Sequence, residues 1–156
     1  MSTLVLLRRR TGSAAVEFAV IGSVFILLLL LIIDVSWQCV TMAALQHGAR
    51  EATRYGVTGQ VGASNNRPAA ILQTVITTTY GVLDSSKLTL VESSAASFSN
   101  LASNTGTTSG PGTAGQIVKY TLSYQSNFLT PVAATLYGAS FIKLTTVMMV
   151  KNEPFS

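Results

Sequence analysis

The sequence predicts an α+β fold in which one long N-terminal helix packs on a small antiparallel sheet. Three observations lead to this expectation. An apolar run covers residues 13–33, a helical periodicity continues from it to residue 55, and three segments of the C-terminal half alternate between apolar and polar residues. The 156 residues suffice for one domain and an anchor, and are too few for two full domains.

The apolar run has the length and composition of a transmembrane helix. Glu17 is the only ionisable residue in it, and its 21 residues span about 31 Å as a helix, the thickness of a bilayer core. Asp34 marks the outer end. A basic flank precedes the run and favours a cytoplasmic N-terminus; it consists of Arg8, Arg9 and Arg10. A cleaved signal peptide fits less well, because its apolar core is shorter, roughly 7–15 residues, and a small-residue cleavage site should follow.

The helical pattern continues beyond Asp34 and stops at the glycines of residues 56–59. Apolar and small residues recur at spacings of three and four, which is one face of a helix: Val35, Cys39, Met42, Leu45, Ala49, Ala52 and Tyr55. Polar residues should lie largely away from that face: Ser36, Gln38, Thr41, Gln46, Arg50 and Arg54. One continuous helix is therefore expected from about Ser13 to Tyr55, with this stripe packed on the chain's own domain.

The C-terminal half predicts short elements separated by turns. In order, they are a turn at 57–68, a helix from Pro68 to about Tyr80, a strand at 87–93, a long surface loop at 94–115, a strand at 116–125, a short helix at 130–138 and a strand at 141–152. Three strands can form an antiparallel meander with one face on the amphipathic half of the long helix.

Charge and cysteine content narrow the possible partners. Only 10% of the residues are charged, and beyond residue 12 seven Lys and Arg accompany six Asp and Glu. A nucleic-acid-binding face would need a basic excess on the folded part, so no nucleic-acid partner is expected. Cys39 is the only cysteine, which excludes an internal disulfide. It is interpreted as a small apolar residue of the helix, with a cross-link between two copies as the alternative.

No catalytic, cofactor or metal site is predicted. The stretch "GPGTAG" at 110–115 satisfies G-x-G-x-x-G by letter, but a loop precedes it and a strand follows it, whereas dinucleotide binding needs a strand before and a helix after. His47 and Glu51 stand one helical turn apart, which supplies too few ligands for a metal. We therefore expect no enzyme activity.

Two stretches of the N-terminal half resemble a known family. Gly12 precedes Glu17 by five positions between a basic run and an apolar one, which resembles the type III signal of type IV pilins and pseudopilins. "GSAAVEFAVIGSVFILLLLLIIDVSW" (12–37) and "ALQHGAREATRYG" (44–56) resemble the TadE-like family of the tight-adherence (Tad, Flp) pilus systems. The ending "VMMVKNEPF" (147–155) is similar to the C-termini of such proteins.

The resemblance implies a pilin-like fold and a minor pilin or pseudopilin of the inner membrane and of a surface pilus. A prepilin peptidase would cut between Gly12 and Ser13, which divides the chain into a leader (1–12), a transmembrane helix (13–33), its extracytoplasmic continuation (34–56) and an exported domain (57–156). The implied partners are that peptidase, other pilin subunits, pilus-assembly platform proteins and membrane lipid.

Glu17 would then neutralise the N-terminal amine of a neighbouring subunit, which offsets the desolvation of both charges. Alternatively, its carboxylate reaches water at the cytoplasmic headgroups. At the level of the whole chain, the alternative is an uncleaved single-pass membrane protein whose outer domain binds a partner or acts as a scaffold.

Overall fold

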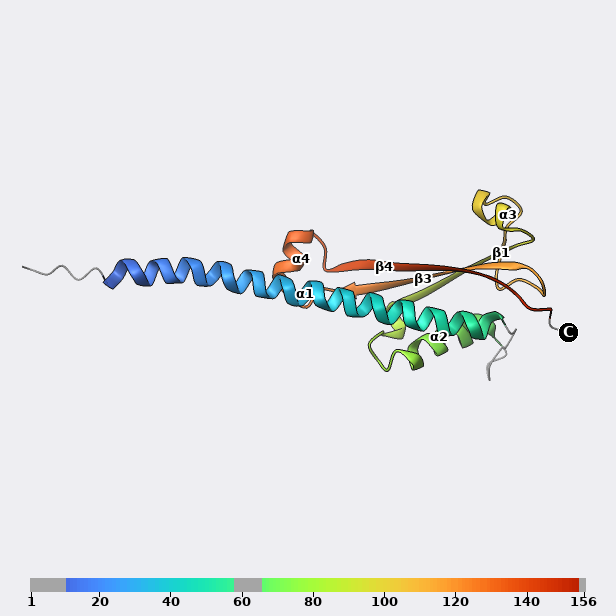
Figure 1. The fold of residues 1–156 in the computed structure, drawn as a ribbon, viewed down its shortest axis with the longest axis horizontal. Coiled ribbons are helices and arrows are strands. Elements are labelled where there is room, and N and C mark those ends of the chain that lie inside the picture. The colour runs from blue at the N-terminus through green and yellow to red at the C-terminus, as the bar shows by residue number, and fades with distance from the viewer. Residues whose placement is uncertain (1–10, 58–65, 155–156) are drawn as a thin grey trace, which may run out of the picture.

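A single helix, α1 (Thr11–Val57), runs through most of the length of the molecule (Figure 1). The computed structural model describes residues 11–57 and 66–154. At 1.5 Å per residue, the 47 residues of α1 extend about 70 Å. Its first half projects beyond the rest of the chain, and its second half lies along a sheet. The predicted α+β architecture with one long helix is confirmed.

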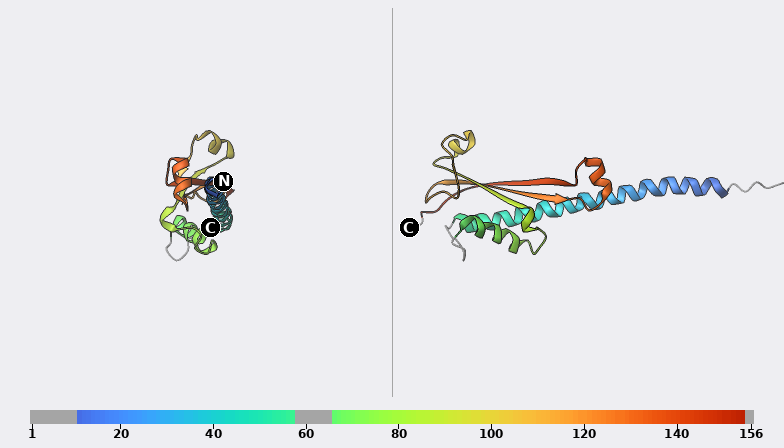
Figure 2. Two further views of the ribbon diagram at one scale, coloured as in Figure 1. Left: turned by 90° about the vertical axis from the view of Figure 1, so that its left-hand side faces the viewer. Right: turned by 180° about the vertical axis from the view of Figure 1, so that it is seen from behind.

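A second helix, α2 (Arg67–Thr78), runs back along the distal end of α1 (Figures 1 and 2). The side chain of Asn66 caps it by accepting a hydrogen bond from the Ala69 N–H at 3.3 Å, and Pro68 occupies its first turn. Both residues favour a helix start, because the cap satisfies a free N–H and proline lacks one. The predicted helix from Pro68 to about Tyr80 is therefore confirmed, with an end slightly earlier than expected.

The sheet is antiparallel throughout, with the strand order β2-β1-β3-β4. Its strands are β1 (Leu88–Ala95), β2 (Thr108–Ser109), β3 (Ile117–Asn127) and β4 (Phe141–Lys151). A 3-10 turn, η1 (Ser85–Lys87), precedes β1, and the short helix α4 (Pro131–Tyr137) connects β3 with β4. The three predicted strands, their meander and the short helix are confirmed.

The prediction of an unstructured loop at 94–115 is wrong in part. This stretch contains the helix α3 (Phe98–Ser103) and the strand β2, which pairs with β1. The Ser97 side chain accepts a hydrogen bond from the Asn100 N–H and so caps α3. Leu101 of α3 is buried with Ala95 and Ile117. The serine cap and the buried leucine both stabilise this helix, although the surrounding composition is that of a loop.

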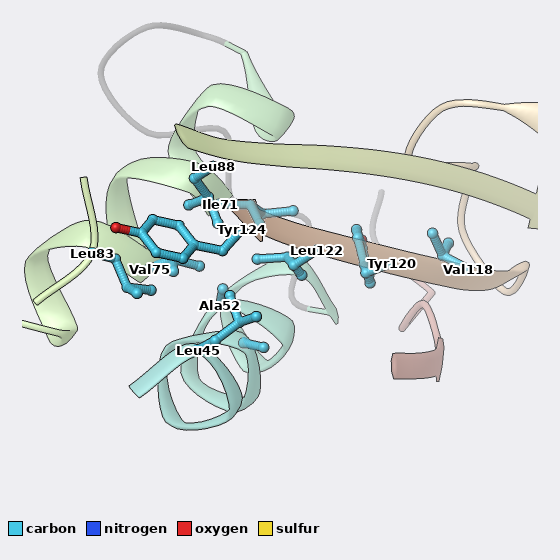
Figure 3. Packing of buried hydrophobic residues seen from close by; sticks show 11 residues of the cluster. Leu45, Ala52, Ile71, Val75, Leu83, Leu88, Val118, Tyr120, Leu122 and Tyr124 are labelled. Carbon is cyan, nitrogen blue, oxygen red and sulfur yellow. The ribbon is translucent and has the colours of Figure 1, made fainter. Parts of the chain in front are cut away.

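The core lies between α1, α2 and the inward face of β3 (Figure 3). Its buried residues are Leu45, Ala49, Ala52, Ile71, Val75, Leu83, Leu88, Val118, Tyr120, Leu122 and Tyr124. The β3 members occupy every second position, so the alternation in the sequence corresponds to the two faces of the strand.

The packed face of α1 differs from the predicted stripe at its membrane-proximal end. Leu45, Ala49 and Ala52 are buried as expected, but Cys39 is exposed and Val35 is 62% exposed. Thr41, expected to lie away from the domain, is fully buried. A threonine can be buried there because its hydroxyl donates to the Trp37 carbonyl at 2.9 Å within the helix, so no polar group loses its partner.

Candidate functional site

The N-terminal end of α1 brings together two of the predicted site residues. Ser13 and Glu17 are one turn apart on the same face, and the Ser13 hydroxyl donates to Glu17 Oε1 at 3.0 Å. Both side chains are exposed, and Gly12 lies in the first turn of the helix. The predicted cytoplasmic flank, Arg8, Arg9 and Arg10, lies outside the described residues. The geometry therefore places an ionisable carboxylate beside the residue that would carry the mature N-terminus.

Most of the apolar half of α1 is exposed in the part of the chain that the structure describes. Large exposed hydrophobic side chains succeed one another here: Val16, Phe18, Val20, Ile21, Val24, Phe25, Ile26, Leu27, Leu28, Leu29, Ile32 and Ile33. In the described part of the chain, α1 is the one helix long and apolar enough to cross a membrane. An apolar surface of this extent indicates a lipid or protein environment rather than water.

Asp34, directly after the apolar run, holds the C-terminal domain against the helix. It is buried, and its Oδ1 accepts a hydrogen bond from the Leu129 N–H at 2.5 Å. Its Oδ2 accepts from the Thr130 N–H at 3.2 Å and also from the Thr130 hydroxyl. Thr130 is in turn the N-cap of α4. One carboxylate of α1 thus fixes the turn between β3 and α4.

The electrostatics of Asp34 favour its charged form. Burial raises the pKa of Asp34, while the hydrogen bonds from the Thr130 hydroxyl and from the Leu129 and Thr130 N–H groups lower it. The hydrogen bonds prevail, and the pKa of Asp34 lies below its ordinary value. One turn further, Gln38 Nε2 donates to the Asn127 carbonyl at 3.2 Å and extends the same junction.

This role of Asp34 was not predicted from the sequence, in which the residue only marks the end of the apolar run. The Thr130-Pro131 pair is a recognisable helix start, and that helix is predicted correctly. No local signal, however, connects it with an aspartate 96 positions earlier in the chain. A buried acidic residue on an otherwise apolar face is the one feature that could have suggested a distant partner.

A second polar cluster closes the distal end of the domain. Arg67 donates to the carbonyls of Gly56 and Pro111 and to Asn152 Oδ1, the last at 3.2 Å. Asn152 Nδ2 donates to the carbonyls of Pro111 at 3.0 Å and Thr113 at 3.1 Å. These bonds tie the end of α1, the stretch at 110–115 and the residue after β4 to one another. The glycines of "GPGTAG" therefore belong to a structural loop.

Glu92 and Tyr120 of the sheet are close enough to Arg67 to interact electrostatically with its positive charge. Desolvation raises the pKa of Glu92, and the positive charge of Arg67 lowers it by a smaller amount. Burial likewise raises the pKa of the Tyr120 phenol. These shifts have structural causes, and neither residue faces a cluster of potential metal ligands: within the described ranges, no group of three His, Cys, Asp or Glu could hold an ion.

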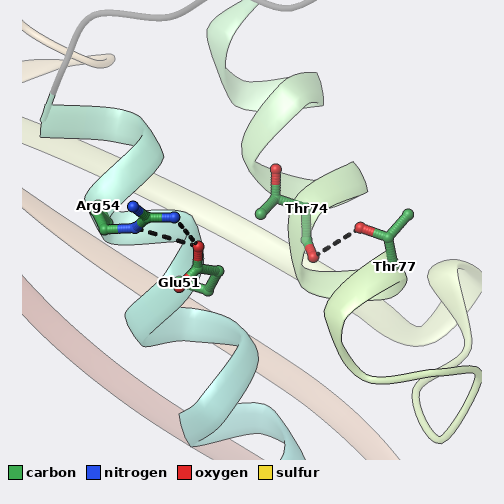
Figure 4. Close-up of polar contacts among 4 residues, drawn as sticks. All are labelled: Glu51, Arg54, Thr74 and Thr77. Atoms are coloured by element: carbon green, nitrogen blue, oxygen red, sulfur yellow. Dashed lines mark hydrogen bonds and ion pairs between the residues drawn. The ribbon is translucent and has the colours of Figure 1, made fainter.

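His47 and Glu51 do not form a site together. Glu51 pairs instead with Arg54 on the surface of α1, one turn away (Figure 4). On the neighbouring α2, the Thr77 hydroxyl donates to the Thr74 carbonyl at 3.1 Å. Both contacts are local to their own helix. Cys39 is a free, exposed thiol.

Comparison with known proteins agrees with the N-terminal half of this picture. A family model described as TadE-like protein matches residues 12–54. The match covers α1 from Gly12 nearly to its end, including Glu17 and Asp34, and confirms the resemblance on which the sequence analysis relied. The comparisons with curated proteins and with solved structures found no match.

Proposed function

We propose that this chain is a minor pilin or pseudopilin of a Tad-type pilus system. A prepilin peptidase removes residues 1–12, residues 13–33 anchor the mature chain in the bacterial inner membrane, and the remainder is exported. The subunit then takes part, with other pilin subunits and platform proteins, in assembling a pilus for surface adhesion and secretion. The observation that carries the proposal is the TadE-like match, which begins at Gly12.

The shape of α1 supports a role in assembly. Its distal half is fixed by the core, whereas the large apolar side chains of its first half, from Val16 to Ile33, are mostly exposed. A surface of this kind can lie in lipid before assembly and pack against neighbouring helices afterwards, without any change in the exported domain. This is a structural role and requires no catalytic group.

Glu17 has a chemical task in this proposal. An unpaired carboxylate in hydrocarbon costs a few kcal/mol even on lenient scales. Cleavage creates an ammonium group on Ser13, the residue whose hydroxyl already contacts Glu17. In a pilus, Glu17 of one subunit pairs with the Ser13 amine of the next, and the pairing offsets the desolvation of both.

Mass spectrometry of protein extracted from membranes tests the processing step. The mature chain should begin at Ser13 and lack twelve residues of the gene product. Gly12→Leu should block cleavage, because its side chain is far larger than that of glycine. An intact N-terminus in cells that contain the peptidase would contradict the pilin assignment and favour an uncleaved single-pass protein.

Glu17→Gln is the second arm of the same experiment. The variant keeps the size of the side chain and removes its charge, so insertion in the membrane becomes easier. Export, processing and membrane abundance should be normal, whereas pilus subunits sheared from the cell surface should be lost. Normal processing together with wild-type amounts of sheared pili would show that Glu17 merely reaches water.

A further inference from the structure

The membrane-proximal end of the exported domain is formed by residues 126–142, and this stretch contains no charged residue. Its helix, α4, lies beside α1 near the outer end of the apolar half (Figures 1 and 2). Leu27 and Leu31 of α1 line one side of a groove whose other side is Pro131, Val132 and Leu136. The two leucines belong to the segment proposed to span the bilayer. The exported domain therefore overlaps that segment along the helix axis.

This overlap determines how deep α4 lies relative to the bilayer. Leu27 precedes Asp34 by seven residues, which is about 10 Å along a helix. If residues 13–33 fill the hydrocarbon core, α4 lies within about 10 Å of its outer boundary. Amphipathic helices that rest on membranes are buried to about 5–10 Å at the boundary between headgroups and acyl chains.

The surface that α4 presents has the chemistry of that zone. Leu136 is 71% exposed, Tyr137 is 59% exposed and Leu129, in the turn before the helix, is 54% exposed. Tyrosine is enriched at membrane interfaces, where its ring is apolar and its hydroxyl reaches water. The Tyr137 ring is held against Phe128, with 5.4 Å between ring centroids. The apolar patch continues into the exposed leucines of α1.

Several backbone N–H groups of this region have hydrogen-bond partners within the protein, as a position without water requires. The N–H groups of Leu129 and Thr130 donate to Asp34, and the Ala133 N–H donates to the Thr130 hydroxyl. At the other end of α4, the Gly138 N–H donates to the Ala134 carbonyl at 3.0 Å. Water would satisfy these groups on an ordinary surface turn, but polar backbone facing lipid must be satisfied internally.

We propose that Leu129 and the exposed face of α4 form a lipid-contacting surface that rests in the outer-leaflet interface. Its partner is the glycerol and upper acyl region of the membrane lipids. The exported domain is thereby attached to the bilayer at two places, α1 and α4, which restricts its tilt. This inference rests on the membrane anchoring in the proposed function.

Nitroxide labels on the full-length chain in nanodiscs, with one chain per disc, test the proposal. Each label is placed on a single cysteine in a Cys39→Ser background. Leu136→Cys reports on α4, and Phe98→Cys of α3 is the matched control, because Phe98 is 56% exposed at the opposite end of the domain. Ile26→Cys reports on the anchor itself. Collision with oxygen indicates lipid, and collision with a water-soluble nickel chelate indicates water.

The Leu136 label should have an oxygen-to-nickel collision ratio several-fold above that of the Phe98 label and below that of the more deeply placed Ile26 label. A Leu136 label as accessible to nickel as Phe98, beside an Ile26 label in lipid, would overturn the α4 inference and leave the anchor intact. A Leu136 label shielded from both reagents would also overturn it, since protein would then cover the surface. An Ile26 label accessible to nickel would refute the membrane anchor as well.

Discussion

Asp34 shows how much a single side chain can contribute at the junction between two environments. It follows the apolar run directly, and it is the group that receives the hydrogen bonds of the turn before α4. Without it, the Leu129 and Thr130 N–H groups would need other partners next to the membrane. The carboxylate thus joins the apolar half of α1 to the C-terminal domain and caps a short helix indirectly through Thr130.

The lowered pKa of Asp34 gives its contribution a pH dependence of known sign. A carboxyl group whose pKa is lower in the folded than in the unfolded chain stabilises the fold above its unfolded pKa, near 3.8. That contribution disappears as the pH falls through the folded pKa. Asp34→Asn should therefore lower the stability of the C-terminal domain at pH 7. The difference from the wild type should shrink only as the pH falls below 3.8, through the lower pKa of the folded chain.

Denaturant unfolding in detergent, followed over a pH series, measures this difference. Glu51→Gln is the control, because the Glu51–Arg54 pair lies on the surface and such pairs contribute about 0–1 kcal/mol. Equal stability of Asp34→Asn and the wild type at pH 7 would contradict the role assigned to this carboxylate.

Among the elements, the contact between α1 and α2 depends on one glycine. A Cβ atom at Gly48 would lie 2.9 Å from Val75 Cγ1, 3.1 Å from Thr79 Cγ2 and 3.3 Å from the Val75 carbonyl oxygen. The two helices approach this closely only because position 48 has no side chain. In the sequence, Gly48 looks like a weak point of the helix; in the fold it is a packing position.

Gly48→Ala should therefore destabilise the domain although alanine is the better helix former. Overpacking typically costs about 1–3 kcal/mol, and the gain in helix propensity is about 1 kcal/mol, so a net loss of about 1 kcal/mol is expected. The thermal midpoint in detergent should fall by about 4 °C. Gly22→Ala is the matched control, since nothing lies within 4 Å of its added Cβ. A midpoint for Gly48→Ala at or above that of Gly22→Ala would refute the close packing.

The elements that the sequence predicts are those with a strong period. α1, β3 and β4 alternate or repeat over many residues, and their positions agree with the prediction to within a few residues. α3 and β2 are not predicted, because their few buried residues, such as Leu101, lie in a stretch rich in Ser, Thr and Gly. The packed face of α1 near Asp34 could not be predicted either. There, hydrogen bonding rather than hydrophobicity decides which side is buried.

At the scale of the whole molecule, α1 carries an apolar surface along its first half and the folded domain along its second half. The apolar half of α1 extends away from the domain, and α2, the sheet and α3 are grouped towards the other end (Figure 1). Asp34 holds one end of the domain to α1, and Arg67, which donates to the Gly56 carbonyl and to Asn152, holds the other end. A rigid connection of this kind means that the orientation of α1 in the membrane determines on which side the entire C-terminal domain lies.

That orientation has a native reporter, because Cys39 is the only cysteine, is exposed, and lies about 8 Å beyond Asp34 along the helix. After reduction, a membrane-impermeant polyethylene-glycol maleimide added to spheroplasts should label Cys39 to the same extent with and without detergent. In sealed inverted vesicles, it should label only after detergent is added. Leu4→Cys, in a chain with Cys39→Ser and Gly12→Leu, should show the opposite pattern, because the three arginines are expected to keep residues 1–12 in the cytoplasm. Labelling of Cys39 in sealed inverted vesicles would reverse the topology and place the domain, together with α4, on the cytoplasmic side.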